Sequence, residues 1–260
     1  MIKFHTIILS ISTISFVYKP QYFGTAAERS SPNSLSAIAT KDFLYHYAIF
    51  AHQFSGGSTQ SGIAEIRGND VLITFGTPGW GVDPATGHTV GSVDQQEGTF
   101  LHELGHNFNF DHGGVDAINC KPNYLSTMSY SRTHSDIISD RPLDFSHSAL
   151  NTLDENNLDE NEGSAESTLP GLTTVYGPPP IKFGSAGNSF DWNRNNHIGD
   201  VGVVADLNHI GPGIAPNFIG CFSNPGQVEY SYDDWSRLVY NIGNHDLHSE
   251  AELFGGSRFT

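Results

Sequence analysis

The chain has 260 residues, of which 28 are acidic and 12 are basic, so its formal net charge at neutral pH is −16. This excess argues against nucleic acid or an anionic membrane as a partner, because both repel an acidic surface. The length is enough for one domain of two lobes, and 28 glycines with 13 prolines predict many loops.

The amino terminus has some features of a signal peptide. Lys3 precedes an apolar run from Ile7 to Val17, and small residues end at Ala27. This pattern predicts a signal peptide over residues 1–27, although serine and threonine interrupt the apolar run. The run is too short to span a bilayer, which takes about 20 apolar residues. The competing interpretation is a chain that lacks part of its upper lobe.

Two apolar segments precede the most informative motif. Residues Phe43 to Phe54 predict a buried strand or a short helix, and Val71 to Gly76 predicts a strand. His46 and His52 lie in the first segment, where we expect core histidines with hydrogen-bond partners rather than metal ligands. After a loop, apolar residues at helical spacing predict a helix from about Asp94 to Phe108.

The predicted helix carries the sequence H-E-x-x-H, with a third histidine six residues further on. His102 and His106 lie one turn apart on one helix face, so both imidazoles can reach one metal ion. A catalytic zinc takes three protein ligands and leaves one position to water, and His112 is the natural third ligand. Glu103 is placed to act as the general base on that water. Chance placement of metal-free histidines is the competing explanation, which this spacing disfavours.

The run from His102 to His112, H-E-x-x-H-x-x-N-x-x-H, is followed by the stretch Ser126-Thr127-Met128-Ser129-Tyr130. Together they resemble the metzincin clan of zinc endopeptidases, over about residues 43–240 and most strongly over 91–132. The resemblance implies an α/β (α+β) fold, a metzincin-like zincin with a twisted mixed β-sheet, an active-site helix and an irregular C-terminal lower lobe. The catalytic domain would span residues 28–245, with the upper lobe ending at about residue 112 and a tail over 246–260.

The resemblance also implies roles for three further residues. Metzincins carry glycine where this chain has Asn109; the position demands left-handed backbone, which asparagine adopts better than most residues. Met128 would form the methionine turn under the zinc without binding the metal, and an ordinary core methionine is the alternative. Tyr130 matches the S-x-M-x-Y form of the astacin-like and serralysin-like branches, which implies a phenol that stabilises the oxyanion. A plain core or rim tyrosine is the competing interpretation.

Two short stretches narrow the resemblance further. The chain has His-Gly-Gly at residues 112–114 and Lys-Pro-Asn-Tyr-Leu-Ser at residues 121–126. Both are similar to stretches of little-described secreted microbial metzincins.

Later segments offer three structural predictions. An acidic stretch from Asp154 to Glu166 predicts a solvated face, and Tyr176 to Gly187, with its three consecutive prolines, predicts a surface loop. Tyr232 to Tyr240 predicts a C-terminal helix with an aspartate cap.

A calcium site and a disulfide each remain one of two interpretations. In one short segment, every second residue has a side-chain oxygen of the kind that calcium prefers. The competing interpretation is a set of turns in which the same side chains hydrogen-bond to their own backbone. The segment's candidate calcium ligands are Asp191, Asn193, Asn195 and Asp200. Cys120 and Cys221 could form one disulfide, which secretion would permit, or remain two buried thiols.

The sequence thus leads to the hypothesis of a secreted, monomeric, zinc-dependent endopeptidase that acts on a protein or peptide substrate. One alternative is a non-catalytic extracellular module that binds zinc or calcium, or a truncated inactive homologue. Another is a zinc hydrolase that acts on a different amide. Glu103 argues against the module, because a protein without hydrolytic activity needs no carboxylate there.

Overall fold

The computed structural model describes residues 8–9, 17–54, 59–164, 172–215, 217–238 and 249–252. The fold is of the mixed α+β class, with small sheets and few helices, as the sequence predicts at that coarse level. The chain divides into two compact units. Unit 1 comprises Met1–Asn109 with Val239–Thr260, and unit 2 comprises Phe110–Leu238. Of the predicted signal peptide, residues 1–7 and 10–16 lie outside the described residues.

Unit 1 is built on a four-stranded mixed sheet with the order β12-β4-β5-β2. Strand β2 pairs in parallel with β5, whereas β4 pairs antiparallel with β5 on its other side. Strand β12 pairs antiparallel with the outer edge of β4, with Glu252 opposite Gly62. The strands span Tyr47–Ala51 (β2), Gly62–Glu65 (β4), Asp70–Thr74 (β5) and Ser249–Glu252 (β12). A smaller parallel pair joins β1 (Ile8–Leu9) to β3 (Gln53–Phe54).

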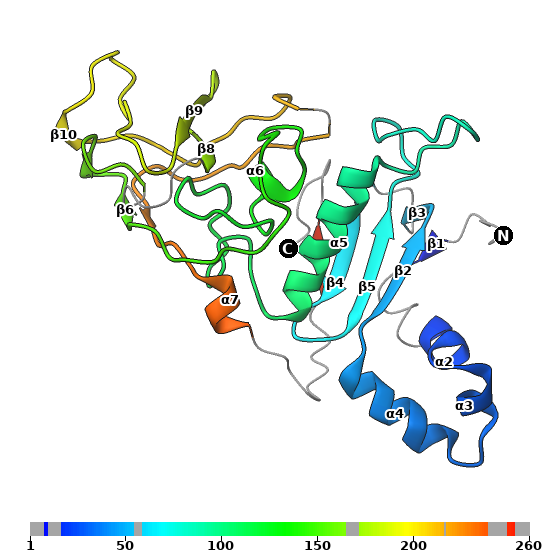
Figure 1. Ribbon diagram of the computed structural model, residues 1–260. Helices are drawn as coiled ribbons and strands as arrows, with labels where there is room; N and C mark the ends of the chain where they lie inside the picture. Colours follow the sequence, from blue (N-terminus) through cyan, green and yellow to red (C-terminus); the bar gives the residue numbers. More distant parts are fainter. Residues whose placement is uncertain are drawn as a thin grey trace. The chain divides into compact units, whose positions relative to one another are not determined.

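The long helix of unit 1, α5 (Val93–Asn107), packs on β4 and β5, as Figure 1 shows. Strand β5 is buried along its whole length, which explains its nearly continuous apolar sequence. Three helices precede the sheet: α2 (Lys19–Tyr22), α3 (Ala26–Ser30) and α4 (Ser34–Leu44). The segment 43–54, predicted as a buried strand or a short helix, is the end of α4 followed by β2 and β3, and β2 is not buried, because its residues alternate between half-buried and exposed. The predicted strand at 71–76 is confirmed as β5.

Unit 2 consists mainly of loops held by short two-stranded sheets. Strand β6 pairs with β11, β7 with β10, and β8 with β9, all antiparallel. The strands are β6 (Leu153–Asp154), β7 (Leu158–Asp159), β8 (Thr173–Tyr176), β9 (Lys182–Ser185), β10 (Val201–Val203) and β11 (Val228–Glu229). The helices are α6 (Tyr130–Thr133) and α7 (Asp234–Arg237). The predicted C-terminal helix is present as α7, capped by Asp233 but shorter than expected.

The prediction of a surface loop from Tyr176 to Gly187 holds for the exposed prolines 178–180 but is wrong for the residues on either side of them. The segment forms the end of β8, a turn through the prolines and the whole of β9. Arg194 holds this turn, because its guanidinium donates hydrogen bonds to the carbonyl oxygens of Pro178 and Pro180, at 2.7 and 3.1 Å. The prolines therefore sit between two strands, where their missing N–H groups cost no ladder hydrogen bonds.

The prediction of a solvated acidic face from Asp154 to Glu166 is wrong for Glu155 and Glu160, whereas Asn156, Asn161 and Glu162 are exposed as predicted. The chain repeats Leu-Asp-Glu-Asn at residues 153–156 and 158–161, and both glutamates of the repeat are fully buried. Glu155 accepts backbone N–H groups from residues 207, 226 and 227. Glu160 likewise accepts from residues 193, 199 and 200. The repeat thus ties together distant loops of unit 2, and residues 165–166 lie outside the described part.

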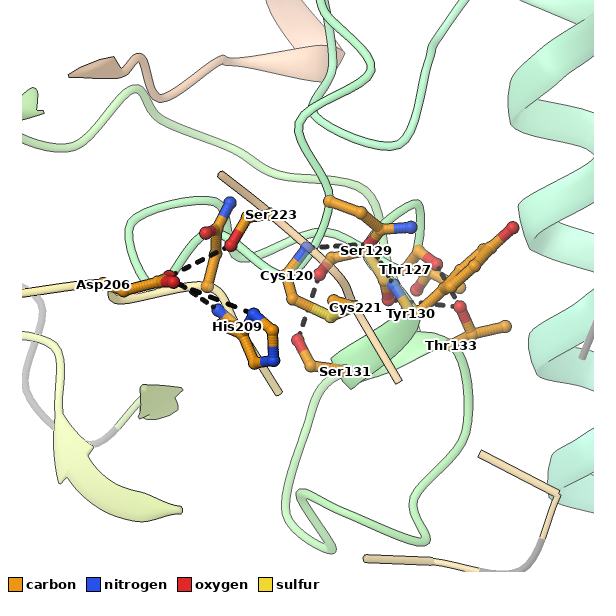
Figure 2. The surroundings of a disulfide bond; sticks show 12 residues. Cys120, Thr127, Ser129, Tyr130, Ser131, Thr133, Asp206, His209, Cys221 and Ser223 are labelled. Carbon is orange, nitrogen blue, oxygen red and sulfur yellow. Dashed lines mark hydrogen bonds and ion pairs between the residues drawn. A yellow bond between two sulfur atoms is a disulfide. The ribbon is translucent and has the colours of Figure 1, made fainter. Parts of the chain in front are cut away.

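A disulfide joins Cys120 to Cys221 across 101 residues of sequence, which confirms the first of the two cysteine interpretations. Figure 2 shows the bond beside the stretch from Thr127 to Thr133. Cys221 also forms a β-bridge with Ile210, and both cysteines pack in an apolar cluster with Ile138 and Val175. The bond therefore links the segment before Met128 to the loops after β10.

We expect the double variant Cys120→Ser with Cys221→Ser to lower the free energy of unfolding by about 2–5 kcal/mol, because a cross-link over a long loop restricts the unfolded chain. Urea denaturation followed by far-UV circular dichroism measures the change. Wild-type protein with a reducing agent serves as a second route to the same state. Equal urea midpoints for the oxidised, reduced and doubly substituted protein would show that the disulfide does not stabilise the fold.

Candidate metal centre

The N-terminus of α5 is fixed by a capping box. The Ser92 hydroxyl accepts the backbone N–H of Gln95, and the Gln95 side chain accepts the N–H of Ser92 at 2.9 Å. Gln95 also accepts the N–H of Gly81 at 3.1 Å, which attaches the preceding loop to the helix. Such caps satisfy N–H groups that have no partner within the helix. The helix thereby starts at a defined residue, which sets the rotation of every side chain after it.

Three histidines meet at the other end of this helix. The metal-ligating nitrogens of His102, His106 and His112 all lie within 4.8 Å of one another, and all three side chains are buried. Among the described residues this is the one cluster of three or more histidine, cysteine or carboxylate ligands. Three converging imidazoles fit zinc, which binds histidine nitrogens at about 2.0–2.1 Å. The structure thus brings together the three predicted ligands.

Helix α5 ends in a turn at Asn109, the position for which the sequence predicts left-handed backbone. Asn109 has a φ of 71°, in the left-handed region, and its N–H bonds to the carbonyl of His106 at 2.9 Å. The guanidinium of Arg67 donates to the side-chain oxygen of Asn109, while the backbone N–H of Arg67 bonds to the carbonyl of His106 at 3.1 Å. Asparagine therefore serves in place of glycine here, supported by its own side-chain hydrogen bond.

Asn107 anchors the same helix end to the sheet, a role that the sequence analysis missed. Its amide donates to the carbonyl oxygen of Glu65 at 2.7 Å, and its side-chain oxygen lies 2.8 Å from Nδ1 of His46. His46 thus has a hydrogen-bond partner, as expected, but it is half-buried rather than in the core, and partial burial lowers its pKa. The helix end that carries His106 is held by β4 and by the residue before β2.

Glu103 is fully buried and lies against Gly62 of β4. A Cβ atom at position 62 would overlap Oε1, Cδ and Cγ of Glu103, so the glycine makes room for this carboxylate. The close approach fixes the side chain between the helix and the strand. Glu103 is the residue next to His102 on the helix, as in the H-E-x-x-H pattern, whose glutamate is the expected general base.

We therefore expect Gly62→Ala to displace the Glu103 carboxylate while the three histidines stay in place. The variant should bind zinc like wild type and lose on the order of 10²-fold in kcat/KM, since a shift of about 1 Å can cost that much. The neighbouring substitution Ile63→Val is the control, because Ile63 packs in a separate apolar cluster with Phe54 and Leu72. If kcat/KM of Gly62→Ala were unchanged, the position of the Glu103 carboxylate beside Gly62 would not matter for catalysis.

The loop that carries His112 is built around two glycines and a buried lysine. A side chain at position 113 would overlap Asp116, and Gly114 has a φ of 87° and lies against Tyr232. The Lys121 ammonium is buried and donates to the carbonyl oxygen of Gly113 at 2.8 Å. The His-Gly-Gly and Lys-Pro-Asn stretches noted in the sequence are therefore parts of one loop support.

The predicted methionine turn is a tight, buried turn. Met128 is fully buried, and the N–H of Ser129 bonds to the carbonyl of Ser126 at 3.0 Å across it. The N–H of Thr127 bonds to the carbonyl of Asp144 at 2.9 Å, which holds the turn from outside.

Tyr130 follows this turn as the first residue of α6 and is half-buried. Its ring centroid lies 4.7 Å from that of His112, and its N–H bonds to Asn119 at 2.9 Å. Tyr130 also packs against the apolar cluster around the disulfide. The tyrosine therefore lies beside the third histidine of the cluster.

The four candidate calcium ligands lie in one loop of unit 2. Asp200 Oδ2 accepts from the amides of Asn193 and Asn195 at 3.0 and 2.7 Å. The Asp191 carboxylate accepts the backbone N–H groups of Asn195 and Asn196 at 3.0 and 2.9 Å. These hydrogen bonds are those that the turn interpretation expects. The same oxygens lie in one loop, so a calcium ion bound there stays a prediction.

We predict that calcium raises the Tm of the wild-type chain and that a loop variant, Asp191→Asn with Asp200→Asn, loses part of that rise. The reason is that calcium binding to the native state alone stabilises it, and the variant removes both charges of the loop. Differential scanning calorimetry over a calcium titration, with magnesium as the control, measures the effect. Identical calcium responses of the two proteins would leave only the turn interpretation.

Comparison with family models, with curated proteins and with solved structures finds no match for this chain. Among the described residues, no helix is both long and apolar enough to cross a membrane. The observations so far define a mixed α+β chain with a buried three-histidine cluster and a glutamate on the same helix.

Proposed function

We propose that this chain is a zinc-dependent endopeptidase of metzincin type. The proposal rests chiefly on one observation, the convergence of the ligating nitrogens of His102, His106 and His112 within 4.8 Å of one another. Three further features support it: the left-handed Asn109, the buried turn at Met128 and the contact of Tyr130 with His112. Each occurs at a position where the metzincin pattern expects it.

The side chains divide the chemical work in the following way. A bound zinc would polarise the scissile carbonyl and lower the pKa of a water from 15.7 to about 7. One carboxylate oxygen of Glu103 would accept a proton from the attacking water and would then deliver it to the departing amine nitrogen. The Tyr130 hydroxyl donates a hydrogen bond to the negative charge that develops on the carbonyl oxygen. His102, His106 and His112 would hold the metal and carry no proton in the reaction.

The substrate would bind as an extended chain along β4. This strand lies against Glu103 through Gly62, and its outer edge pairs antiparallel with β12 in the structure. The edge therefore accepts an antiparallel strand, and we expect a substrate segment to take the place of β12. Main-chain hydrogen bonds would then hold the substrate without regard to its side chains.

Secretion is part of the proposal. The Cys120–Cys221 disulfide supports it, because such bonds persist in oxidising compartments. The net charge of −16 is compatible with an extracellular monomer whose partner is a protein or peptide.

Product analysis tests this function. Purified chain with zinc is incubated with unfolded casein, and the fragments are identified by mass spectrometry. We expect cuts at internal peptide bonds that a zinc chelator stops and added zinc restores. Removal of terminal residues alone would favour a hydrolase for short peptides, and zinc-loaded, folded protein without any cleavage would favour the non-catalytic module.

A further inference from the structure

A buried carboxylate of unit 2, Glu229, has no hydrogen-bond partner. It lies on β11 and is fully buried, and both of its carboxylate oxygens lack a partner among the described residues. Burying an unpaired carboxylate costs several kcal/mol, so a folded protein normally provides donors or a cation for it. A partner of some kind is therefore to be expected at this position.

The two glutamates of the Leu-Asp-Glu-Asn repeat show how the same unit treats other buried carboxylates. Glu155 and Glu160 are as deeply buried as Glu229, and each accepts three backbone N–H groups. Glu229 differs, because no backbone or side-chain donor reaches it within the described part of the chain. The missing partner is thus specific to Glu229.

The charges around Glu229 are mainly negative. Glu155 and Asp206 raise its pKa together with the loss of hydration, which is the largest cause, whereas Lys121 lowers it. Lys121, however, uses its ammonium group on Asp116 and on the carbonyl oxygens of Gly113 and Tyr230. An external cation would lower the electrostatic cost of this arrangement.

Two buried amide oxygens, on residues that contact Gln227 or the backbone of Glu229, are also without partners among the described residues. The ladder between β6 and β11 pairs Glu229 with Leu153 and continues through the hydrogen bond from Glu155 N to Gln227 O. The side chains of Gln227 and Glu229 therefore point to the same face, because alternate residues of a strand do so. The amide nitrogen of Asn208 donates to Oε1 of Gln227 at 3.3 Å, and its buried side-chain oxygen is unpaired.

Asn123 approaches Glu229 through its backbone. The Asn123 amide nitrogen donates to the carbonyl oxygens of Glu229 and Asn151, both at 2.8 Å. Its side-chain oxygen is likewise buried and has no described partner. Glu229, Asn123 and Asn208 thus contribute four buried oxygens without donors, and both asparagines are hydrogen-bonded to the segment 227–229.

We propose that Glu229, with the amide oxygens of Asn208 and Asn123, binds a calcium ion inside unit 2. Oxygen ligands and the irregular surroundings suit calcium, which takes 6–8 oxygen ligands in flexible geometry. The site contains one carboxylate, which distinguishes it from the three-histidine cluster and from the loop of residues 191–200. It does not depend on the proposed peptidase activity, and its function is to hold β11 against β6.

Metal analysis of zinc-loaded protein after equilibration with calcium chloride tests the proposal. The loop variant, Asp191→Asn with Asp200→Asn, should retain one calcium per chain, and adding Glu229→Gln should remove it without loss of zinc. Calcium should also raise the Tm of the loop variant, by about 5–10 °C at a hundredfold excess over Kd. Glutamine has nearly the shape of glutamate, so the added substitution changes mainly the charge.

Three results would overturn the site. The first is a folded loop variant that retains no calcium, a measurement that does not require Glu229→Gln to fold. The second is equal calcium content with and without Glu229→Gln. The third is a Glu229→Gln protein that is more stable than wild type at every calcium concentration, which would show that Glu229 is buried as a neutral acid.

Discussion

Glu103→Gln is expected to bind zinc as wild type does and to cleave unfolded casein about 10²–10⁴-fold more slowly, the usual contribution of a general base. Glutamine keeps the shape of the side chain in the space beside Gly62, but it cannot accept the proton of the attacking water. Steady-state kinetics should show the loss in kcat, with little change in KM, because the carboxylate acts on the transition state rather than on the bound substrate.

Two comparisons make this result interpretable. Zinc content and Tm of the variant must equal those of wild type, so that loss of the metal or of the fold is excluded. The Ile63→Val variant on the neighbouring strand should keep full activity. A Glu103→Gln protein with wild-type kcat would show that another group takes the proton, and the assignment of Glu103 would then be wrong.

His112→Ala is expected to lower the bound zinc from about one equivalent per chain to near zero and to abolish casein cleavage, since a catalytic zinc site needs three protein ligands. The substitution should affect zinc binding more than folding, because the loop is also held by Lys121 and by Gly113 and Gly114. Zinc content by mass spectrometry and circular dichroism together separate the two effects.

The matched control is His147→Ala. His147 is exposed, and its Nε2 lies 2.8 Å from Oδ2 of Asp144. The substitution therefore tests the effect of removing a histidine outside the cluster. This variant should keep its zinc and its activity. Full zinc content in His112→Ala would mean that the metal is held by a different set of ligands.

The candidate metal centre could be predicted from the sequence because its signal is local. His102, Glu103 and His106 lie within two turns of one helix, and His112 follows after a single turn at Asn109. Helical periodicity places such residues without knowledge of the rest of the fold. Strand β5 was predictable for a similar reason. All five of its residues are buried, so its sequence is a nearly continuous apolar run, which is also a local signal.

Unit 2 was less predictable because its contacts are distant in sequence. The acidic stretch that begins at Asp154 indicated a solvated face. Glu155 is nevertheless buried, and its carboxylate accepts hydrogen bonds from the backbone N–H groups of residues 207, 226 and 227. No composition rule reveals donors that come from loops more than 50 residues away. The Leu-Asp-Glu-Asn repeat was visible in the sequence and could have indicated two equivalent structural positions.

The β8–β9 pair and the role of Asn107 illustrate the same limit. The three prolines after Tyr176 indicated a loop, but four residue pairs connect the strands on either side of the turn. Asn107 has no unusual feature in the sequence, and only the arrangement of β4, β5 and His46 around it reveals its function as an anchor.

X-ray absorption at the zinc edge of the wild-type chain is the most direct test of the proposed metal centre. The account predicts one zinc per chain with three nitrogen ligands at about 2.0–2.1 Å and a fourth ligand of oxygen, as in catalytic zinc sites. Folded protein that retains no zinc, or a spectrum without three imidazole nitrogens, would contradict it.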